Sequence, residues 1–207
     1  MMLQSAIESV FSRLEETDHA LDDLAALFGD IDKTYNRIAT SYRFQCNGCS
    51  DNCCETLFYH HTLLEYLYLL KGFRSLENEA RQKAMEKAFH VSGLQKKSET
   101  EETTQRLRIL CPLNSKGLCI TYPYRPMICR MHGIPSEMRF PNGKKSITPG
   151  CGLFHQNQSS KSYITFDRTP YYIELAKQEK NVRLTMGFNE KIKMTVAQML
   201  ISMAELL

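Results

Sequence analysis

Eight cysteines constrain this chain of 207 residues more than any other feature, because four of them fall within nine residues. The dense group reads Cys46-Asn-Gly-Cys49-Ser-Asp-Asn-Cys53-Cys54, and four more follow at Cys111, Cys119, Cys129 and Cys151. Two cysteines separated by two residues form a knuckle that offers two thiolates to one soft metal ion. Cys46 and Cys49 have this spacing, so the pattern predicts a ligand set rather than core packing.

The expected cell compartment bears on how these cysteines are used. Residues 1–8 lack the basic cluster, apolar run and cleavage site of a secretory signal, so we expect a cytoplasmic protein. Thiols stay reduced there, which favours metal binding or redox chemistry over a disulfide framework. The longest apolar stretch, residues 63–70, contains Glu65 and is far shorter than the ~20 residues of a membrane span. We therefore expect no membrane partner.

Charge is distributed unevenly along the chain, although the net charge is only +3. Residues 1–32 carry eight acids and one base, whereas residues 106–145 carry eight bases and one acid. The basic stretch coincides with the second group of cysteines and is interpreted as compensation for thiolate charge. A solvated basic face and a weak nucleic-acid patch are the alternatives. A pI near 8.4 is too mild to favour nucleic acid as a partner.

Two arginines stand beside the downstream cysteines. A metal centre held by four thiolates carries a formal charge of about −2, so nearby guanidinium groups offset charge and donate hydrogen bonds to sulfur. We expect Arg125 and Arg130 to bind the centre in this way. The alternative is a structural salt bridge from these arginines to Glu55 or Glu65, and the two roles are compatible.

Apolar periodicity predicts a mostly α-helical protein. Apolar residues at steps of three and four predict one long helix over residues 3–28 that ends at Gly29, with a second helix at 32–42 forming a hairpin with it. Residues 55–70 read as a helix that is apolar on nearly all sides and is ended by Gly72. The remaining helices are predicted at residues 78–91, 169–180 and 189–207, with a polar connection at 92–105 in which a short helix restarts at Ser98.

Residues 111–149 lack the apolar periodicity of a helix, because six of the seven prolines lie there and interrupt it. The stretch predicts loops with one hairpin, whose best turn signal is Asn142-Gly143. Pro112, Pro123 and Pro126 prevent helical hydrogen bonding around the cysteines and free backbone amides for sulfur. We predict a single domain over residues 1–207, a helical bundle with a loop-dominated, Cys-rich metal site at about 46–154.

The residues around the cysteines resemble those of a known family. The first cluster is followed by Cys111-Pro112-Leu113, Cys119, Tyr122, Arg125-Pro126, Cys129-Arg-Met-His-Gly-Ile-Pro and Cys151 with Leu153-Phe154. This series is similar to the CxxCxxCC, or YkgJ-type, cysteine-cluster family, which is described as zinc- or iron-chelating. The resemblance covers about residues 46–154, with three residues rather than two between Cys49 and Cys53.

The resemblance implies a zinc or iron centre, the iron as a [4Fe–4S] cluster. We expect the metal ligands among all eight cysteines, Cys46, Cys49, Cys53, Cys54, Cys111, Cys119, Cys129 and Cys151. The centre is either structural or mounted for catalysis or sensing. A related branch resembles flagellin lysine N-methylase, so a methyl-transfer or redox enzyme acting on a protein substrate is the alternative function. A metal carrier would keep its ligands exposed, whereas the proline framework favours a fixed site.

Histidines near the cysteines are further candidates, namely His60, His61, His132 and His155. His132 follows Cys129 by three residues and is the best candidate for a ligand or proton carrier. A nucleophilic pair of Cys129 and His132 is another interpretation, for which no orienting third group or oxyanion site is recognisable in the sequence.

Overall fold

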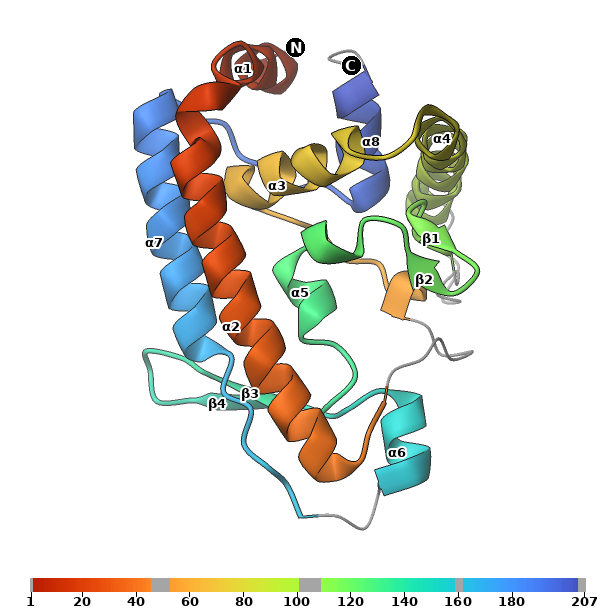
Figure 1. Ribbon diagram of the computed structural model, residues 1–207, viewed down its shortest axis with the longest axis vertical. Coiled ribbons are helices and arrows are strands. Elements are labelled where there is room, and N and C mark those ends of the chain that lie inside the picture. The colour runs from red at the N-terminus through yellow and green to blue at the C-terminus, as the bar shows by residue number, and fades with distance from the viewer. Residues whose placement is uncertain (1, 46–52, 101–108, 159–161, 205–207) are drawn as a thin grey trace.

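The chain forms a set of packed helices, as the periodicity predicts (Figure 1). The computed structural model describes residues 2–45, 53–100, 109–158 and 162–204. The α-helices are α1 (Met2–Phe11), α2 (Asp18–Tyr42), α3 (Leu63–Arg74), α4 (Asn78–Thr100), α5 (Met127–Arg130), α6 (Gly152–Gln158), α7 (Thr169–Met186) and α8 (Val196–Ala204). Short 3-10 helices are η1 (Leu14–Thr17), η2 (Cys53–Glu55) and η3 (Tyr122–Tyr124). Small antiparallel sheets pair β1 (Asn114–Ser115) with β2 (Leu118–Cys119), and β3 (Ser136–Arg139) with β4 (Lys145–Thr148). The predicted mostly α fold is confirmed.

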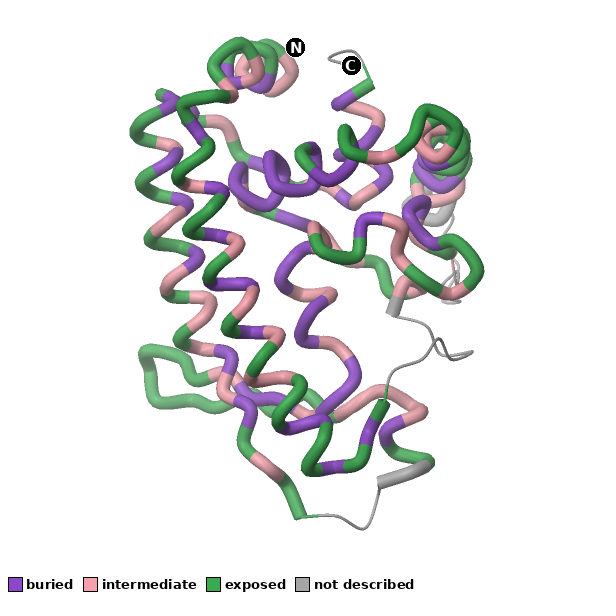
Figure 2. Tube along the Cα trace, in the orientation of Figure 1, coloured by how far each residue is buried: buried purple, intermediate pink, exposed green. Residues whose placement is uncertain are grey.

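Helix α3 lies at the centre of the fold and contacts α2, α7 and α8 (Figure 1). All its residues from 63 to 70 are buried (Figure 2). A helix that is apolar all round has to be covered on more than one side, so this prediction from composition is confirmed. Around it, α2 and α7 run antiparallel side by side, and α4 packs against α8. Helices long and apolar enough to cross a membrane are absent from the described residues.

The N-terminal helices differ from the prediction. The chain leaves the helical conformation after Phe11, where Arg13 takes φ −125° and ψ 27° and its guanidinium pairs with Glu16. Helix α2 then runs without interruption through Gly29. Its buried apolar stripe continues as far as Tyr42, and burial of these side chains outweighs the ~1 kcal/mol that glycine costs in a helix. The predicted helical hairpin is therefore wrong.

Gly72 lies inside α3 rather than at its end. A Cβ at this position would lie 2.3 Å from Cγ of Tyr124, so glycine lets η3 approach the helix. The helix also begins later than predicted, because Thr62 caps its N-terminus and its Oγ1 accepts a hydrogen bond from the N–H of Glu65 at 3.2 Å. The prediction of a helix over 55–70 with a break at Gly72 is wrong at both ends.

Replacing Gly72 by alanine is expected to lower the free energy of unfolding by about 2 kcal/mol, because the added methyl group overlaps the ring of Tyr124. The matched change Gly29→Ala is expected to raise it by about 0.5–1 kcal/mol, since no atom lies within 4 Å of the added Cβ. Urea unfolding followed by circular dichroism measures both changes. Effects of the same sign and size would contradict the packing role of Gly72.

The other predicted helices are present with shifted bounds. Helix α4 continues through most of the expected connection at 92–105, and α7 begins at the predicted Thr169 but extends to Met186. Gly187 then ends α7 with φ +65°. Helix α8 begins at Val196 rather than at the predicted residue 189. Thr195 caps its N-terminus, since its Oγ1 accepts a hydrogen bond from the N–H of Gln198 at 3.3 Å. Local caps, rather than the apolar stripe, set these ends.

The loop-rich region contains the hairpin predicted from Asn142-Gly143, which is β3 with β4. Gly143 takes φ +77° in its turn. A second hairpin, β1 with β2, was not predicted, because its turn uses Lys116 in the left-handed conformation at φ 52° before Gly117. Such a φ is uncommon for a residue other than glycine, so the sequence gives little signal for it.

Candidate metal centre

Cys54 and Cys111 are joined through the backbone. Cys54 lies in η2, and its carbonyl oxygen accepts a hydrogen bond from the backbone N–H of Cys111 at 2.8 Å. Pro112 follows Cys111 and has no N–H to donate. The chain turns here, and the N–H of Asn114 donates to the carbonyl oxygen of Cys111 at 2.9 Å. Two cysteine segments that are far apart in the sequence are therefore neighbours.

Cys119 is carried by the hairpin of β1 and β2. It stands opposite Asn114 in the strand register. The side-chain oxygen of Asn114 accepts a hydrogen bond from the N–H of Gly117 at 3.1 Å, which closes the turn between the strands. Sγ of Cys119 lies 3.5 Å from Oγ1 of the buried Thr121. The hairpin thus returns Cys119 to the segment that begins at Cys111.

Cys129 is held against the helical core by a buried carboxylate. It lies in α5, where its N–H donates to the carbonyl oxygen of Pro126 at 3.1 Å. Glu65 of α3 accepts a hydrogen bond from the N–H of Met127 at 3.0 Å and another from Oγ1 of Thr62 at 2.6 Å. Glu65 therefore connects the first turns of α3 and α5. We did not predict this role, although Thr62 and Glu65 have the spacing of a capping box.

The thiols of Cys54, Cys111, Cys119 and Cys129 lie within electrostatic reach of one another. Burial, followed by the charges of Cys119 and Cys54, raises the pKa of Cys129 to about 12. Burial is also the main cause that raises the pKa of Cys111 and of Cys119, and neighbouring thiols add to both shifts. The charge of Arg125 acts in the opposite direction on the pKa of Cys119 and Cys129. Four half-buried cysteines from separate chain segments therefore gather in one region.

In the folded, metal-free protein, Cys111 and Cys129 are expected to react with iodoacetamide at least about 100-fold more slowly than in the unfolded chain near neutral pH. Only the thiolate attacks, and desolvation raises the pKa of both thiols, while each residue is half-buried and so only partly accessible. Mass spectrometry of the alkylated peptides over time measures the rates, with the urea-unfolded chain as reference. Similar rates in the two states would contradict the burial of these thiols.

Two buried donors near the thiols have no acceptor among the described residues. They are Nε of Arg125 and Nδ2 of Asn114. A buried N–H without a partner costs about 1–3 kcal/mol, so each position favours an acceptor. Sulfur atoms of a thiolate-bound metal centre accept such hydrogen bonds. The chemistry of the cysteine sulfurs and of these two N–H donors therefore suits a thiolate-bound metal.

The described residues do not form a complete ligand set by themselves. Among them, no group of three or more His, Cys, Asp and Glu side chains is arranged to hold a metal ion. Cys46 and Cys49, the predicted knuckle, lie outside the described residues, and only the backbone of Cys53 is described. The metal centre and its eight ligands therefore stay predictions.

Cys151 belongs to a different part of the fold. It precedes α6, which lies away from the β1–β2 hairpin (Figure 1). Its N–H donates to the carbonyl oxygen of Gly133 at 2.9 Å, and its own carbonyl oxygen accepts from the N–H of His155 at 3.1 Å. Its charge is not among the main causes that shift the pKa of Cys111, Cys119 or Cys129. The structure thus groups four of the predicted ligands and leaves the role of Cys151 as a prediction.

Arg125 and Arg130 both form ion pairs with Asp32 of α2. Nη1 of Arg130 lies 2.6 Å from Oδ2 of Asp32, and Nη2 of Arg125 lies 3.3 Å from Oδ1. Both arginines therefore do form structural salt bridges, as the alternative interpretation predicted, but with a different acid. The expected partner Glu65 is engaged instead with Met127 and Thr62.

The two arginines have different surroundings. Arg130 is buried, donates to the carbonyl oxygens of Arg125 and Pro123, and places its guanidinium 4.3 Å above the ring of Phe28. These contacts fix the proline-rich loop against α2. Arg125 is the cation whose charge reaches the thiols. Asp32 was missed as a partner, although it follows Phe28 by one helical turn and so lies on the same face of α2.

The histidines next to the first cluster are held by a C-terminal segment. His60 exchanges backbone hydrogen bonds with Met194, and Nδ1 of His61 lies 3.1 Å from the carbonyl oxygen of Ile192. His132 packs its ring edge-on against Phe58, with ring centroids 6.2 Å apart. The assignment of His132 as a ligand or proton carrier stays a prediction.

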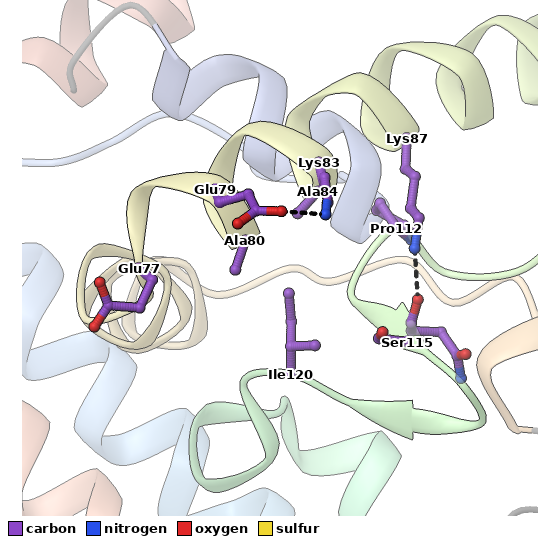
Figure 3. A pocket seen from close by; sticks show the side chains of 10 residues that line it. Glu77, Glu79, Ala80, Lys83, Ala84, Lys87, Pro112, Ser115 and Ile120 are labelled. Atoms are coloured by element: carbon purple, nitrogen blue, oxygen red, sulfur yellow. Dashed lines mark hydrogen bonds and ion pairs between the residues drawn. The ribbon is translucent and has the colours of Figure 1, made fainter.

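A groove of about 320 Å³ adjoins the cysteine loops. One wall is α4, and the other includes Pro112 and Ile120, which directly follow two of the cysteines (Figure 3). Lys87 crosses between the walls and donates to the carbonyl oxygen of Asn114 at 3.0 Å. Lys83 in the same wall is paired with Glu79. The residues that line the groove include no thiol or histidine, so the groove adds no soft metal ligand to the centre.

Comparison with protein-family models, curated proteins and solved structures finds no match for this chain. Membership of the YkgJ-type family therefore stays a prediction from the cysteine pattern. The grouping of Cys54, Cys111, Cys119 and Cys129 rests on the contacts of the chain itself and does not depend on that resemblance.

Proposed function

We propose that the chain is a metal-binding protein whose cysteines hold zinc or iron, the iron as a [4Fe–4S] cluster. The observation that carries the proposal is that the half-buried Cys54, Cys111, Cys119 and Cys129 lie together in one region, within reach of the charge of Arg125. A cytoplasmic location and membership of the CxxCxxCC (YkgJ-type) family are parts of the same proposal. The remaining predicted ligands are Cys46, Cys49, Cys53 and Cys151.

The surroundings of the thiols favour a closed, structural centre. When bound, the metal supplies a cross-link between loops that have little regular structure of their own, and its binding free energy becomes folding free energy. Arg125 and Asn114 would donate hydrogen bonds to sulfur, since each has a buried donor without an acceptor among the described residues. Arg130 and Asp32 hold the loop that carries Cys129 in place.

A redox or N-methylase-like enzyme acting on a protein substrate is the alternative proposal. Redox chemistry needs a thiolate that is accessible, and a catalytic metal needs an open coordination position. Burial raises the pKa of both Cys111 and Cys129, which keeps their thiols protonated near neutral pH when no metal is bound. These observations favour the structural centre.

Protein purified without oxygen is expected to contain at least one zinc or iron atom per chain. An iron–sulfur centre colours the protein brown with absorbance near ~400 nm, whereas zinc leaves it colourless. Elemental analysis of the preparation, together with its absorption spectrum, measures both quantities. The same preparation after treatment with a chelator is the control. A metal content well below one atom per chain would overturn the proposal.

A further inference from the structure

Among the described residues, none pairs with the outer edge of strand β4, whereas the outer edge of β3 is covered. On β3, the N–H of Glu137 donates to the carbonyl oxygen of Phe166 at 2.9 Å, and the carbonyl oxygen of Glu137 accepts from the N–H of Arg168 at 2.8 Å. The chain thus places its own residues 166–168 along that edge. The backbone groups of Glu137 therefore face away from β4.

The strand register then decides which groups of β4 face outward. Glu137 is opposite Ile147, and Arg139 is opposite Lys145. Because backbone groups alternate sides along a strand, the N–H and carbonyl groups of Lys145 and Ile147 point away from β3. All four residues of β4 are exposed, and no described residue is paired with this edge. Two donors and two acceptors are thus presented along one open strand.

The side chains beside this edge combine apolar surface with positive charge. Ile147 is 57% exposed, and Phe140 and Tyr163 nearby are also exposed. The hairpin from residue 136 to 148 carries three bases and one acid, Glu137. That acid is already paired with Arg139 and Lys145, so it does not offset Lys144 at the turn. A second copy of the same basic strand would be repelled, because lysines on an edge disfavour self-pairing.

We propose that β4 is a docking strand for an extended, acidic segment of a partner protein, which adds beside Lys145 and Ile147 as a further strand. Backbone hydrogen bonds to these two residues would supply affinity. Acidic side chains would meet Lys144, and alternate apolar side chains would pack on Ile147 and Tyr163. This surface is separate from the cysteine region, so the inference does not depend on the proposed function.

A labelled eight-residue peptide of alternating Glu and Val is the probe, and the Lys-Val peptide is its matched control. Binding of the Glu-Val peptide is expected to slow amide hydrogen exchange of Lys145 and Ile147 by at least about fivefold, as measured by NMR. The N–H groups of Ser146 and Met138, which already face the partner strand, are expected to keep their exchange rates. Binding of the Lys-Val peptide is expected to be weaker.

Two variants test the same surface. Ile147→Pro removes an outward N–H without removing a hydrogen bond to β3, and it is expected to weaken binding of the Glu-Val peptide at least about fivefold. Lys144→Glu leaves the whole backbone ladder in place and is expected to weaken binding by reversing one charge. The proposal is overturned if neither variant changes binding, or if binding leaves the two amides unprotected. It is also overturned if a labelled twelve-nucleotide thymidine strand binds the hairpin and the Glu-Val peptide does not.

Discussion

Replacement of Cys129 by serine is expected to abolish stoichiometric metal binding and to lower the melting temperature by about 6–12 °C. The shift corresponds to a loss of about 3 kcal/mol for a chain of this size. Cys129 is the described thiol whose pKa is raised by burial, by two neighbouring thiols and by Glu65, so it lies where these charges converge. Elemental analysis and thermal unfolding measured on one preparation of the variant test both parts.

Thr121→Val is the matched control for this experiment. Thr121 is buried with its hydroxyl 3.5 Å from Sγ of Cys119, so valine keeps the shape and leaves every thiol in place. The control is expected to retain its metal and to lose less than about 1.5 kcal/mol of stability. Full metal content in Cys129→Ser would remove Cys129 from the ligands. Cys119→Ser, in the β1–β2 hairpin rather than in α5, repeats the test if Cys129→Ser does not fold.

The helical class was predictable because apolar periodicity reports which faces are buried. The ends of helices were less predictable, since they depend on single contacts that periodicity does not report. Gly29 and Gly72 look alike in sequence, yet one has open space around it and the other faces the ring of Tyr124. Neither ends a helix. Gly187 does end α7, because it takes the left-handed conformation at φ +65° and its N–H caps the last turn.

The sequence predicted that cysteines from both halves of the chain meet, and Cys54, Cys111, Cys119 and Cys129 do lie together in the structure. The full set of eight ligands stays a prediction. The residues that hold these four cysteines, Glu65 and Asp32, come from helices whose sequences read as ordinary core and acidic surface. A single sequence does not show which acidic residue will contact a given arginine or backbone N–H far away in the chain. Several Asp and Glu residues are equally suitable, and only the packing of the helices brings one of them into contact.

Replacement of Asp32 by asparagine is expected to lower the free energy of unfolding by about 2–3 kcal/mol, because it leaves Arg130 buried without a carboxylate. The side chain of Arg130 is 3% exposed and that of Asp32 is 33% exposed. Solvent around Asp32 keeps the expected loss below the ~3–5 kcal/mol of a fully buried pair. Burial lowers the pKa of Arg130 and the charge of Asp32 opposes this shift, so the cation is destabilised when Asp32 is removed. Urea unfolding measures the change.

Asp30→Asn on the same helix is the matched control, since Asp30 is exposed and pairs with the exposed Lys33. Its effect is expected to be less than about 0.5 kcal/mol. The double variant Asp32→Leu with Arg130→Met is expected to recover part of the loss, because it replaces both partners of the more buried pair by apolar residues and leaves only the more exposed Arg125 without its carboxylate. Equal losses for Asp32→Asn and Asp30→Asn would contradict the anchoring of the loop to α2. Since Arg130 directly follows Cys129, Asp32→Asn is also expected to surrender metal to a chelator faster than Asp30→Asn does, which connects the helical scaffold to the proposed centre.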